Sequence, residues 1–531
     1  MQDSCDVLIV GAGASGAASA WNLSKHFEKI VCLEQGSWTD PSKYPSTKED
    51  WEFHRTREYS PFPNERNLPS DYPINDHESQ ISIANYNAVG GSTILYSGHF
   101  PRMHPSDFSA YSLDNVGSDW PFQYQDLEKY YNLNDQMMGV SGLEGDPAYP
   151  EITNLLPPIG LGSIAEIMGN GFNKLGWHWW PSYSAILTRE KNGRASCINL
   201  GPCNSGCPQG AKGSVDITYW PEAIRNGVKL ITEARVKEVI TDQNDKVKGV
   251  TYFDKNGKKC SLSAMIVILA CNGVGTPRLL LNSKSKVSDS SLANRSGLVG
   301  KNLMMHPLGF VEGVFGRNIN SHIGPHGCCI QSQEFYETNL ERGFKRGFTM
   351  QILRAPGPVE LAISGIQRRT IPWGENHHAS FKKFMGSTIG ISIICEDLPE
   401  ESNQVLLDKT LRDSHGIPAP KIIYKMGNNT KKMMSYGIDR AKEVLTESGA
   451  SKTFSFGPVR KTGWHLMGTT KMGLDPRNSV VNQDGMCHDV ENLYVVDSSI
   501  FPTSGGVNPT STIQAVALYL TDKIVRRNLQ K

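Results

Sequence analysis

The chain has 531 residues, with 54 Lys or Arg against 53 Asp or Glu, so its formal net charge at pH 7 is +1. This balance gives no long-range field that would attract nucleic acid or an anionic membrane. The length is too great for one simple hydrophobic core, and two or three domains are expected. No apolar run is long enough to predict a membrane span.

The N-terminus and the cysteines indicate the compartment. The first residues lack a charged region followed by an apolar segment and enter a strand-like run almost at once, so a cytoplasmic location is expected. Eleven cysteines in so long a chain do not make a disulfide framework. Most of them are expected to be reduced thiols.

Residues 5–36 have the pattern of a dinucleotide-binding unit. The run from Val7 to Val10 is typical of a buried parallel strand, and it ends in GAGASG at residues 11–16. Glycines at this spacing allow a tight turn, a close approach of backbone to a pyrophosphate, and close packing of the next helix. The phosphates would then lie at the N-terminus of that helix, where unpaired amides favour an anion.

A second predicted strand, KIVCLE, ends in an acidic residue. Glu34 lies roughly 20 residues after the glycines, where a carboxylate can accept hydrogen bonds from ribose hydroxyls and disfavours a 2′-phosphate. The residues of this unit that we expect to contact the dinucleotide are Gly11, Gly13, Ala14, Ser15, Gly16 and Glu34. The pattern does not separate FAD from NAD, because the same interactions hold both.

The next segments lie between the nucleotide-binding elements. Residues 37–83 are rich in Pro, Ser, Asp and Tyr without periodicity, which predicts a long loop that covers the nucleotide domain. Gly90 and Gly91 then precede Ser92 and Thr93, and here backbone can approach a flat or charged ligand. A plain turn is the alternative to this second cofactor contact.

An aromatic cluster occurs in FNKLGWHWWPS. Trp177, Trp179 and Trp180 surround His178 in this segment. Such rings can stack on a sugar, but a cluster of this kind more often belongs to a core or a domain interface, and we favour the core.

Two later regions predict further sheet structure. The run MIVILACNGVGTPRLLLNS at 265–283 is typical of a buried strand followed by a helix, and we expect it to return the chain to the nucleotide sheet. Residues 306–458 contain several short apolar runs separated by polar loops. They predict a second, sheet-based domain that supplies most substrate contacts.

The C-terminal region carries the candidate proton acceptor. His465 follows Trp464 and precedes a Gly-Thr loop, and this neighbourhood distinguishes it among the fourteen histidines. Histidine is the commonest proton acceptor near neutral pH.

A strand and a helix close the chain. The strand is predicted to end at Asp497, and the helix starts near Pro509, with Asn508 or Thr510 able to cap it. The positive end of this helix would favour the negative charge that develops on the edge of a flavin during reduction.

Segments from both ends and from the middle of the chain resemble the glucose-methanol-choline (GMC) flavoprotein oxidoreductases. In chain order they are VLIVGAGASG, VGGSTILYSG, VILACNGVGTPRLLLNS, GLVGKNLMMHP, WHLMGTTKMG and VVDSSIFPTSGGVNPT. The resemblance implies an α/β fold in which a Rossmann-like FAD-binding domain is interleaved with an α+β substrate domain built on an antiparallel sheet. It assigns residues 1–36, 84–135, 195–305 and 459–531 to the FAD-binding domain, 37–83 to a covering loop, and 136–194 and 306–458 to the substrate-binding domain.

The resemblance also implies FAD and a residue pair in front of the flavin that handles the substrate hydroxyl. These two catalytic residues are His465 and Asn508. Further cofactor contacts are expected from Val236, Ala270, Asp497, Asn508, Pro509 and Thr510. Since no histidine occurs between Gly91 and His99, we expect the FAD to be held non-covalently.

Three cysteines resemble a narrower feature. In the glucose, gluconate and fructose dehydrogenase branch, cysteines of the segment that corresponds to Cys197, Cys203 and Cys207 hold a three-iron cluster, and closely spaced thiolates are natural ligands of Fe–S clusters. A cysteine that is usually doubled there occurs once here, with Ile198 beside it. The sequence is therefore compatible with two alternatives for these cysteines, a 3Fe–4S cluster or a loop of free or disulfide-bonded cysteines.

The expected activity is FAD-dependent oxidation of an alcohol, with a sugar, glycoside or polyol as the favoured substrate and His465 as general base. The electron acceptor would be oxygen, a quinone or a redox protein. One alternative is a flavin-bound lyase without redox chemistry. The other is a flavoprotein subunit that relays electrons through an Fe–S cluster to a partner.

Overall fold

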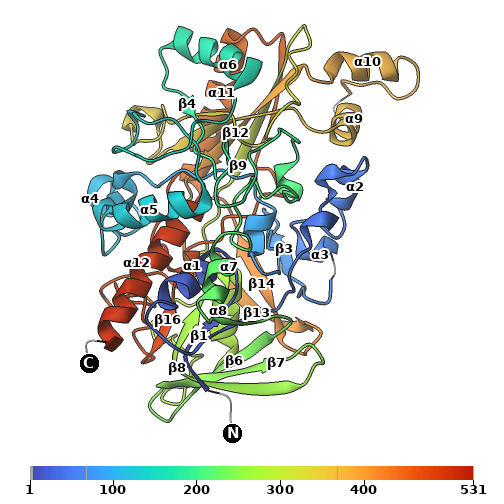
Figure 1. Ribbon diagram of the computed structural model, residues 1–531. Coiled ribbons are helices and arrows are strands. Elements are labelled where there is room, and N and C mark those ends of the chain that lie inside the picture. The colour runs from blue at the N-terminus through green and yellow to red at the C-terminus, as the bar shows by residue number, and fades with distance from the viewer. Residues whose placement is uncertain (1–3, 67, 368, 530–531) are drawn as a thin grey trace.

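The computed structural model describes residues 4–66, 68–367 and 369–529, and these residues form three β-sheets. Figure 1 shows the largest sheet at the lower end of the molecule, near both termini, and the second sheet at the upper end. The largest sheet has the strand order β5-β2-β1-β8-β7-β6, with β16 paired to β8. Its strands are β1 (Ser4–Val10), β2 (Ile30–Leu33), β5 (Lys229–Ile231), β6 (Arg235–Thr241), β7 (Val247–Phe253), β8 (Lys259–Leu269) and β16 (Leu493–Val495).

Strand β1 lies at the centre of the parallel part of this sheet. Val7 pairs with Ile30 of β2 on one side and with Ile266 of β8 on the other, and all three are buried. Parallel strands are covered on both faces, which explains why these strands are continuous apolar runs. The predicted return of residues 265–283 to the nucleotide sheet is confirmed. Strands β5 and β6 follow each other closely and are separated at Glu233, whose φ is 53°.

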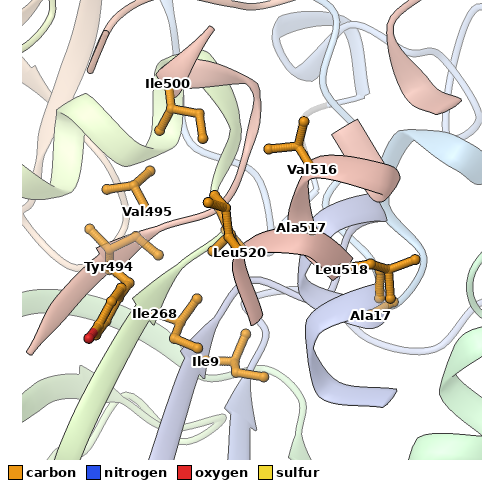
Figure 2. Packing of buried hydrophobic residues seen from close by; sticks show 14 of the residues in the cluster. Ile9, Ala17, Ile268, Tyr494, Val495, Ile500, Val516, Ala517, Leu518 and Leu520 are labelled. Atoms are coloured by element: carbon orange, nitrogen blue, oxygen red, sulfur yellow. The ribbon is translucent and has the colours of Figure 1, made fainter. Parts of the chain in front are cut away.

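Helices α1 (Ala14–Leu23) and α12 (Thr510–Leu529) pack against each other beside the sheet. Figure 2 shows Ala17 of α1 next to Leu518 of α12, and Ile9 and Ile268 of the sheet to the left of them. A polar contact joins the same two helices, because the Nδ2 of Asn22 donates to the Oγ1 of Thr521 at 3.0 Å. The last helix of the chain therefore holds the first one in place.

Three further helices pack around the first sheet and its two covering helices. Helix α5 (Tyr124–Met138) packs on α12, α7 (Tyr219–Arg225) packs on α1, and α8 (Asn272–Asn282) follows β8. Helix α5 begins at Tyr124, where Gln123 and Asp126 form a capping box.

The second sheet is antiparallel, in the order β15-β9-β12-β11-β10-β4. Its strands are β4 (Trp180–Pro181), β9 (Leu308–Val314), β10 (Ile330–Ser332), β11 (Phe348–Leu353), β12 (Thr388–Cys395) and β15 (Lys452–Phe456). Helices α11 (Asn428–Glu447) and α6 (Gly162–Leu175) cover one face of it. Residues alternate along each strand: Val311 and Ile391 pack in the apolar core under these helices, whereas Phe310 and Ser392 face a cavity on the opposite side.

A third, small sheet joins distant segments. It has the order β13-β14-β3, with β13 (Gln404–Arg412), β14 (Pro418–Tyr424) and β3 (Asn75–Ser79). Residues 37–83, expected as a loop without secondary structure, thus supply β3 and also the short helices α2 (Trp51–His54) and α3 (Pro63–Arg66). The difference arises because β3 pairs with a strand more than 300 residues away, which local sequence patterns cannot reveal.

The fold agrees with the predicted α/β architecture, in which a largely parallel sheet is interleaved with an antiparallel one. The proposed boundaries of the two domains stay a prediction. Within the described residues, no helix is both long and apolar enough to cross a membrane.

Candidate active site

A cavity of about 800 Å³ lies between the first sheet and the exposed face of the second. Its volume falls in the range of roughly 300–1,000 Å³ that is common for ligand and cofactor sites. All but two of the residues predicted to contact the cofactor line this cavity. They are Gly11, Gly13, Ala14, Ser15, Glu34, Gly91, Ser92, Thr93, Val236, Ala270, Asp497, Asn508, Pro509 and Thr510.

The two exceptions, Gly16 and Gly90, are not part of the cavity lining. A Cβ atom on Gly16 would lie 1.9 Å from the carbonyl oxygen of Gly11, so Gly16 allows α1 to pack against the strand, which is the role predicted for the third glycine. Gly90 has a φ of 103°, and its Cβ would lie 3.0 Å from the side chain of Asp216. Both glycines are therefore required by the fold, and the interpretation of Gly90 as a cofactor contact gains no support.

The N-terminus of α1 opens into the cavity. Gly13 is its N-cap residue and provides no side-chain cap, and within the described structure no heavy atom lies within 4 Å of a Cβ built on it. Amides of the first turn are thus left for a ligand, and a side chain at this position would fill the space in front of them. This arrangement fits a phosphate group.

Glu34 lies at the end of β2, beside the glycine loop. Its Oε2 accepts a hydrogen bond from the N–H of Ala12 and its Oε1 one from the N–H of Gly36, each at 2.8 Å. Burial raises the pKa of Glu34, and the two N–H groups oppose this shift. Each carboxylate oxygen keeps a further acceptor site, which fits a ribose hydroxyl.

Asp497 follows β16 and has its oxygens engaged by protein. The Oδ2 accepts hydrogen bonds from the N–H of Asn272 at 3.0 Å and from the Oγ1 of Thr276 at 2.6 Å. Burial raises the pKa of this carboxyl. Asp497 therefore fixes the start of α8 at the cavity wall.

The predicted base His465 lies in the cavity wall and has a histidine partner. Met304 and Met467 exchange two backbone hydrogen bonds of 3.0 Å in an antiparallel bridge. This register places His306 opposite His465, and their Nδ1 atoms lie 2.8 Å apart. The Nε2 of His306 lies 2.8 Å from the carbonyl oxygen of Gly505.

The hydrogen bonds determine which nitrogens carry protons. A carbonyl oxygen only accepts, so the Nε2 of His306 carries a hydrogen. Burial lowers the pKa of His306 to about 4, so its Nδ1 is free of a proton near neutral pH and accepts. The Nδ1–H of His465 is then the donor between the rings, and the Nε2 of His465 keeps its lone pair. Burial, followed by the neighbouring His306 and His99, lowers the pKa of His465 well below its ordinary value.

Asn508 precedes α12 and is oriented by the second sheet. The Nε2 of Gln351 donates a short hydrogen bond to the Oδ1 of Asn508, so the Nδ2 of Asn508 is left to donate elsewhere. Two residues earlier on β11, the Oγ1 of Thr349 donates to the carbonyl oxygen of Gly506 at 2.8 Å. The loop before α12 is therefore fastened to β11 at two points, and Asn508 and His465 line the same cavity.

The segment 37–83 closes one side of the cavity. Glu52 of α2 accepts hydrogen bonds from the N–H groups of Val359 and Glu360, each 2.8 Å long, at the start of α9 (Pro358–Gln367). All three residues line the cavity. In Figure 1, α9 lies directly above α2, next to α10 (His377–Phe384).

Sequence reasoning missed three polar residues of the cavity, namely His306, Gln351 and His99. His306 is part of the segment GLVGKNLMMHP, which resembled the family, so a histidine in a matching motif was an available signal. Gln351 lies on a strand whose sequence contains no catalytic pattern. His99 entered only as the first histidine after Gly91, in the argument for non-covalent FAD.

The tryptophan cluster is part of the packed structure. Trp177 stacks edge-on against Phe335, with ring centres 4.9 Å apart, and Trp179 also packs on the core of the second sheet. Neither these two nor Trp180 belongs to the cavity lining. The core interpretation is confirmed.

The three cysteines lie in a segment that the fold holds by other means. The Nζ of buried Lys212 donates to the carbonyl oxygens of Cys203, Ile94 and Tyr96, each at 2.7 Å. Burial raises the pKa of Cys203 to about 12, which keeps its thiol protonated. All eleven cysteines are free thiols. Throughout the described ranges, no group of three or more His, Cys, Asp or Glu is arranged for a metal ion, so the 3Fe–4S cluster gains no support.

The chain has matches among known protein families. Two models described as GMC oxidoreductase match residues 5–308 and residues 399–517. The chain therefore belongs to the GMC oxidoreductase family. GMC oxidoreductases bind FAD, and the chain is a GMC-type alcohol oxidase or dehydrogenase.

Individual relatives extend along the whole chain. The 2-methyl-1,2-propanediol dehydrogenase of Mycolicibacterium austroafricanum is 40% identical, over 99% of this chain and 96% of that protein. The fructose dehydrogenase large subunit of Gluconobacter japonicus is 27% identical, over 98% of each. Among solved structures, pyridoxine 4-oxidase from Mesorbium loti superposes with a TM-score of 0.65 at 15% identity, over 99% of both chains. That last likeness shows the fold alone.

Proposed function

We propose that this protein oxidises the CH–OH group of a small diol or polyol to a carbonyl, with FAD held non-covalently in the cavity. FAD, when bound, supplies the acceptor for the hydride. The residues at the cavity wall fit this cofactor, because they offer free helix amides for phosphate and a buried carboxylate for ribose. Leu95 and Tyr96 line the cavity after Gly90 and Gly91, and neither side chain is an imidazole or a thiol to which a flavin could be attached.

The observation that carries the proposal is the 2.8 Å contact between the Nδ1 atoms of His465 and His306, because a donating Nδ1–H of His465 leaves a lone pair on its Nε2. This nitrogen accepts the proton of the substrate hydroxyl. A positioned base contributes a rate factor of typically about 10²–10⁴. Both imidazoles start neutral, because burial lowers the pKa of each.

Asn508 supports the same step from another side of the substrate. Its Nδ2 donates to the substrate oxygen, while Gln351 holds its Oδ1. Helix α12 begins at Thr510, two residues after Asn508, and its N-terminus lines the cavity, so its positive end stabilises negative charge that develops there. Asn508 thus holds the substrate oxygen through its Nδ2, while His465 takes the hydroxyl proton at its Nε2.

Three considerations favour a diol or polyol as substrate. A relative with 40% identity is named for a diol. The second sheet contributes polar groups to the cavity, among them Gln351 and Ser392. No tryptophan of the 177–180 cluster is available to stack on a larger sugar ring, although a relative at 27% identity is named for fructose. The reduced cofactor would pass its electrons to oxygen, a quinone or a redox protein.

Anaerobic mixing with a series of alcohols tests the proposal. Small diols and polyols are expected to bleach the absorbance of the oxidised flavin and to yield one carbonyl product per flavin. Monitoring the flavin and the substrate together separates oxidation from a lyase activity. Consumption of substrate while the flavin stays oxidised would refute the redox mechanism.

A further inference from the structure

A second imidazole faces the cavity without a protein partner. His99 is 4% exposed and lines the cavity together with His465. The backbone of Gly327 lies nearby, but among the residues that the structure places neither ring nitrogen of His99 has a partner with hydrogen-bond geometry. A buried polar group without a partner costs free energy, so such groups are usually satisfied by a ligand or an ordered water.

The position of His99 is fixed by the backbone on both sides. The N–H of Ala185 donates to the carbonyl oxygen of Gly98 at 2.8 Å, and the N–H of Phe100 donates to that of Tyr183 at 2.9 Å. The pairing therefore fixes the backbone of His99 at the cavity wall. The ring thus keeps hydrogen-bonding capacity that the backbone of Gly327 does not satisfy with good geometry.

The protonation state of His99 indicates what it can bind. Burial lowers the pKa of His99 to about 4, and the backbone of Gly327 opposes the shift only in part. The ring is therefore neutral near pH 7, with one nitrogen that donates and one that accepts. A hydroxyl group also donates and accepts, so it is the matching ligand, whereas a carboxylate would prefer a charged partner.

His99 and His465 line the same cavity. His99 is also among the groups that lower the pKa of His465, after burial and His306. His465 is engaged with the hydroxyl that loses its proton, and Asn508 holds the same oxygen. A second hydroxyl on the neighbouring carbon of the substrate would need its own hydrogen-bond partner in this cavity.

We propose that His99 binds a second hydroxyl of the substrate, next to the one that His465 deprotonates, and so selects a diol or polyol over a simple alcohol. This inference rests on the proposed function and names the residue that determines its substrate class. His99 is a specificity residue in this account, and the proton transfer itself remains with His465.

The test compares 1,2-propanediol with 1-propanol in the holoenzyme, in the wild type and in His99→Leu. The rate constant of anaerobic flavin reduction divided by the dissociation constant is expected to fall about 10–100-fold for the diol in His99→Leu, and less than about threefold for the monoalcohol. His99→Gln keeps a donor and an acceptor and is expected to restore part of the preference. His77→Leu is the matched control, since His77 is exposed and outside the cavity.

A second readout does not depend on turnover. Diol binding is measured from the perturbation of the oxidised flavin spectrum, and His99→Leu is expected to weaken it about tenfold or more while the spectrum of the free holoenzyme stays unchanged. Equal losses for both alcohols, or no loss for either, would overturn the role of His99. So would a shifted spectrum or flavin potential without a change in diol preference, because His99 would then act on the cofactor.

The two proposals fail in different ways. If no alcohol reduces the wild-type flavin, the proposed oxidation is wrong, and the binding measurement still decides whether His99 holds the diol. If alcohols reduce the flavin but His99→Leu keeps the wild-type preference, the inference about His99 alone is wrong.

Discussion

The Nδ1 atoms of His306 and His465 lie 2.8 Å apart, in rings carried by two segments that pair backbone to backbone at Met304 and Met467. The carbonyl oxygen of Gly505 holds the other nitrogen of His306. This chain of contacts selects one tautomer of each ring. The basic nitrogen of His465 is therefore a consequence of how three distant segments pack together.

Replacing His306 tests this arrangement. His306→Leu removes the acceptor for the Nδ1–H of His465, and we expect the rate of anaerobic flavin reduction to fall roughly 10–100-fold with FAD still bound. His306→Asn offers an oxygen near the position of Nδ1 and should retain most of the rate. Equal rates in His306→Leu and the wild type would show that the histidine pair does not orient the base.

Gln351 controls the orientation of Asn508. In Gln351→Leu the Asn508 amide loses its partner, and the reduction rate should fall about 3–10-fold, the equivalent of one hydrogen bond. Gln331→Leu is the matched control, because Gln331 pairs with Gln351 across strands β10 and β11 but does not line the cavity. Stopped-flow measurement of the flavin reduction rate in both variants shows whether the effect is specific to Gln351. A comparable loss in Gln331→Leu would assign the effect to the sheet.

Three glycine-to-alanine variants separate cofactor binding from folding. Gly13→Ala should weaken FAD binding about tenfold or more without destabilising the apoprotein, because its Cβ meets only the cavity. Gly16→Ala should lower the free energy of unfolding by about 1–3 kcal/mol, since its Cβ would overlap the backbone of Gly11. Gly160→Ala is the control, with open space around its Cβ. FAD titration and urea unfolding report the two quantities, and a Gly13→Ala variant with wild-type affinity would refute the phosphate site.

The buried histidines predict an acid-sensitive fold. Burial lowers the pKa of His99 to about 4, whereas a histidine in an unfolded chain has a pKa of about 6.5. Between these values the unfolded chain binds a proton that the folded one does not, so stability is complete above pH ~6.5 and falls as the pH is lowered towards 4. One such group accounts for roughly 2 kcal/mol at pH 5.

Urea unfolding at pH 7 and pH 5 checks this effect. His99→Leu should lose less stability on acidification than the wild type, and His77→Leu, which replaces an exposed histidine, should follow the wild type. Identical losses in all three proteins would mean that His99 is not a buried neutral group.

Much of the nucleotide-binding half could be predicted, because its signals are local. The glycine loop, the strand before it and Glu34 lie within one short stretch, and glycine positions and apolar runs report backbone geometry directly. The return of residues 265–283 to the sheet was predicted for the same reason.

The remainder depends on contacts between distant segments. His306 and His465 are 159 residues apart, and Gln351 and Asn508 are 157 apart. Only strand register and backbone pairing bring such side chains together, and neither produces a local pattern. The segment 37–83 was predicted as a loop for a similar reason, since β3 exists through its pairing with β14.

Rapid anaerobic mixing of His465→Ala holoenzyme with a reactive diol tests the central claim most directly. The account predicts a variant that retains its FAD but reduces it about 10²–10⁴-fold more slowly than the wild type, with His77→Ala unaffected. A His465→Ala variant that binds FAD and reduces it at the wild-type rate would contradict the assignment of His465 as the base.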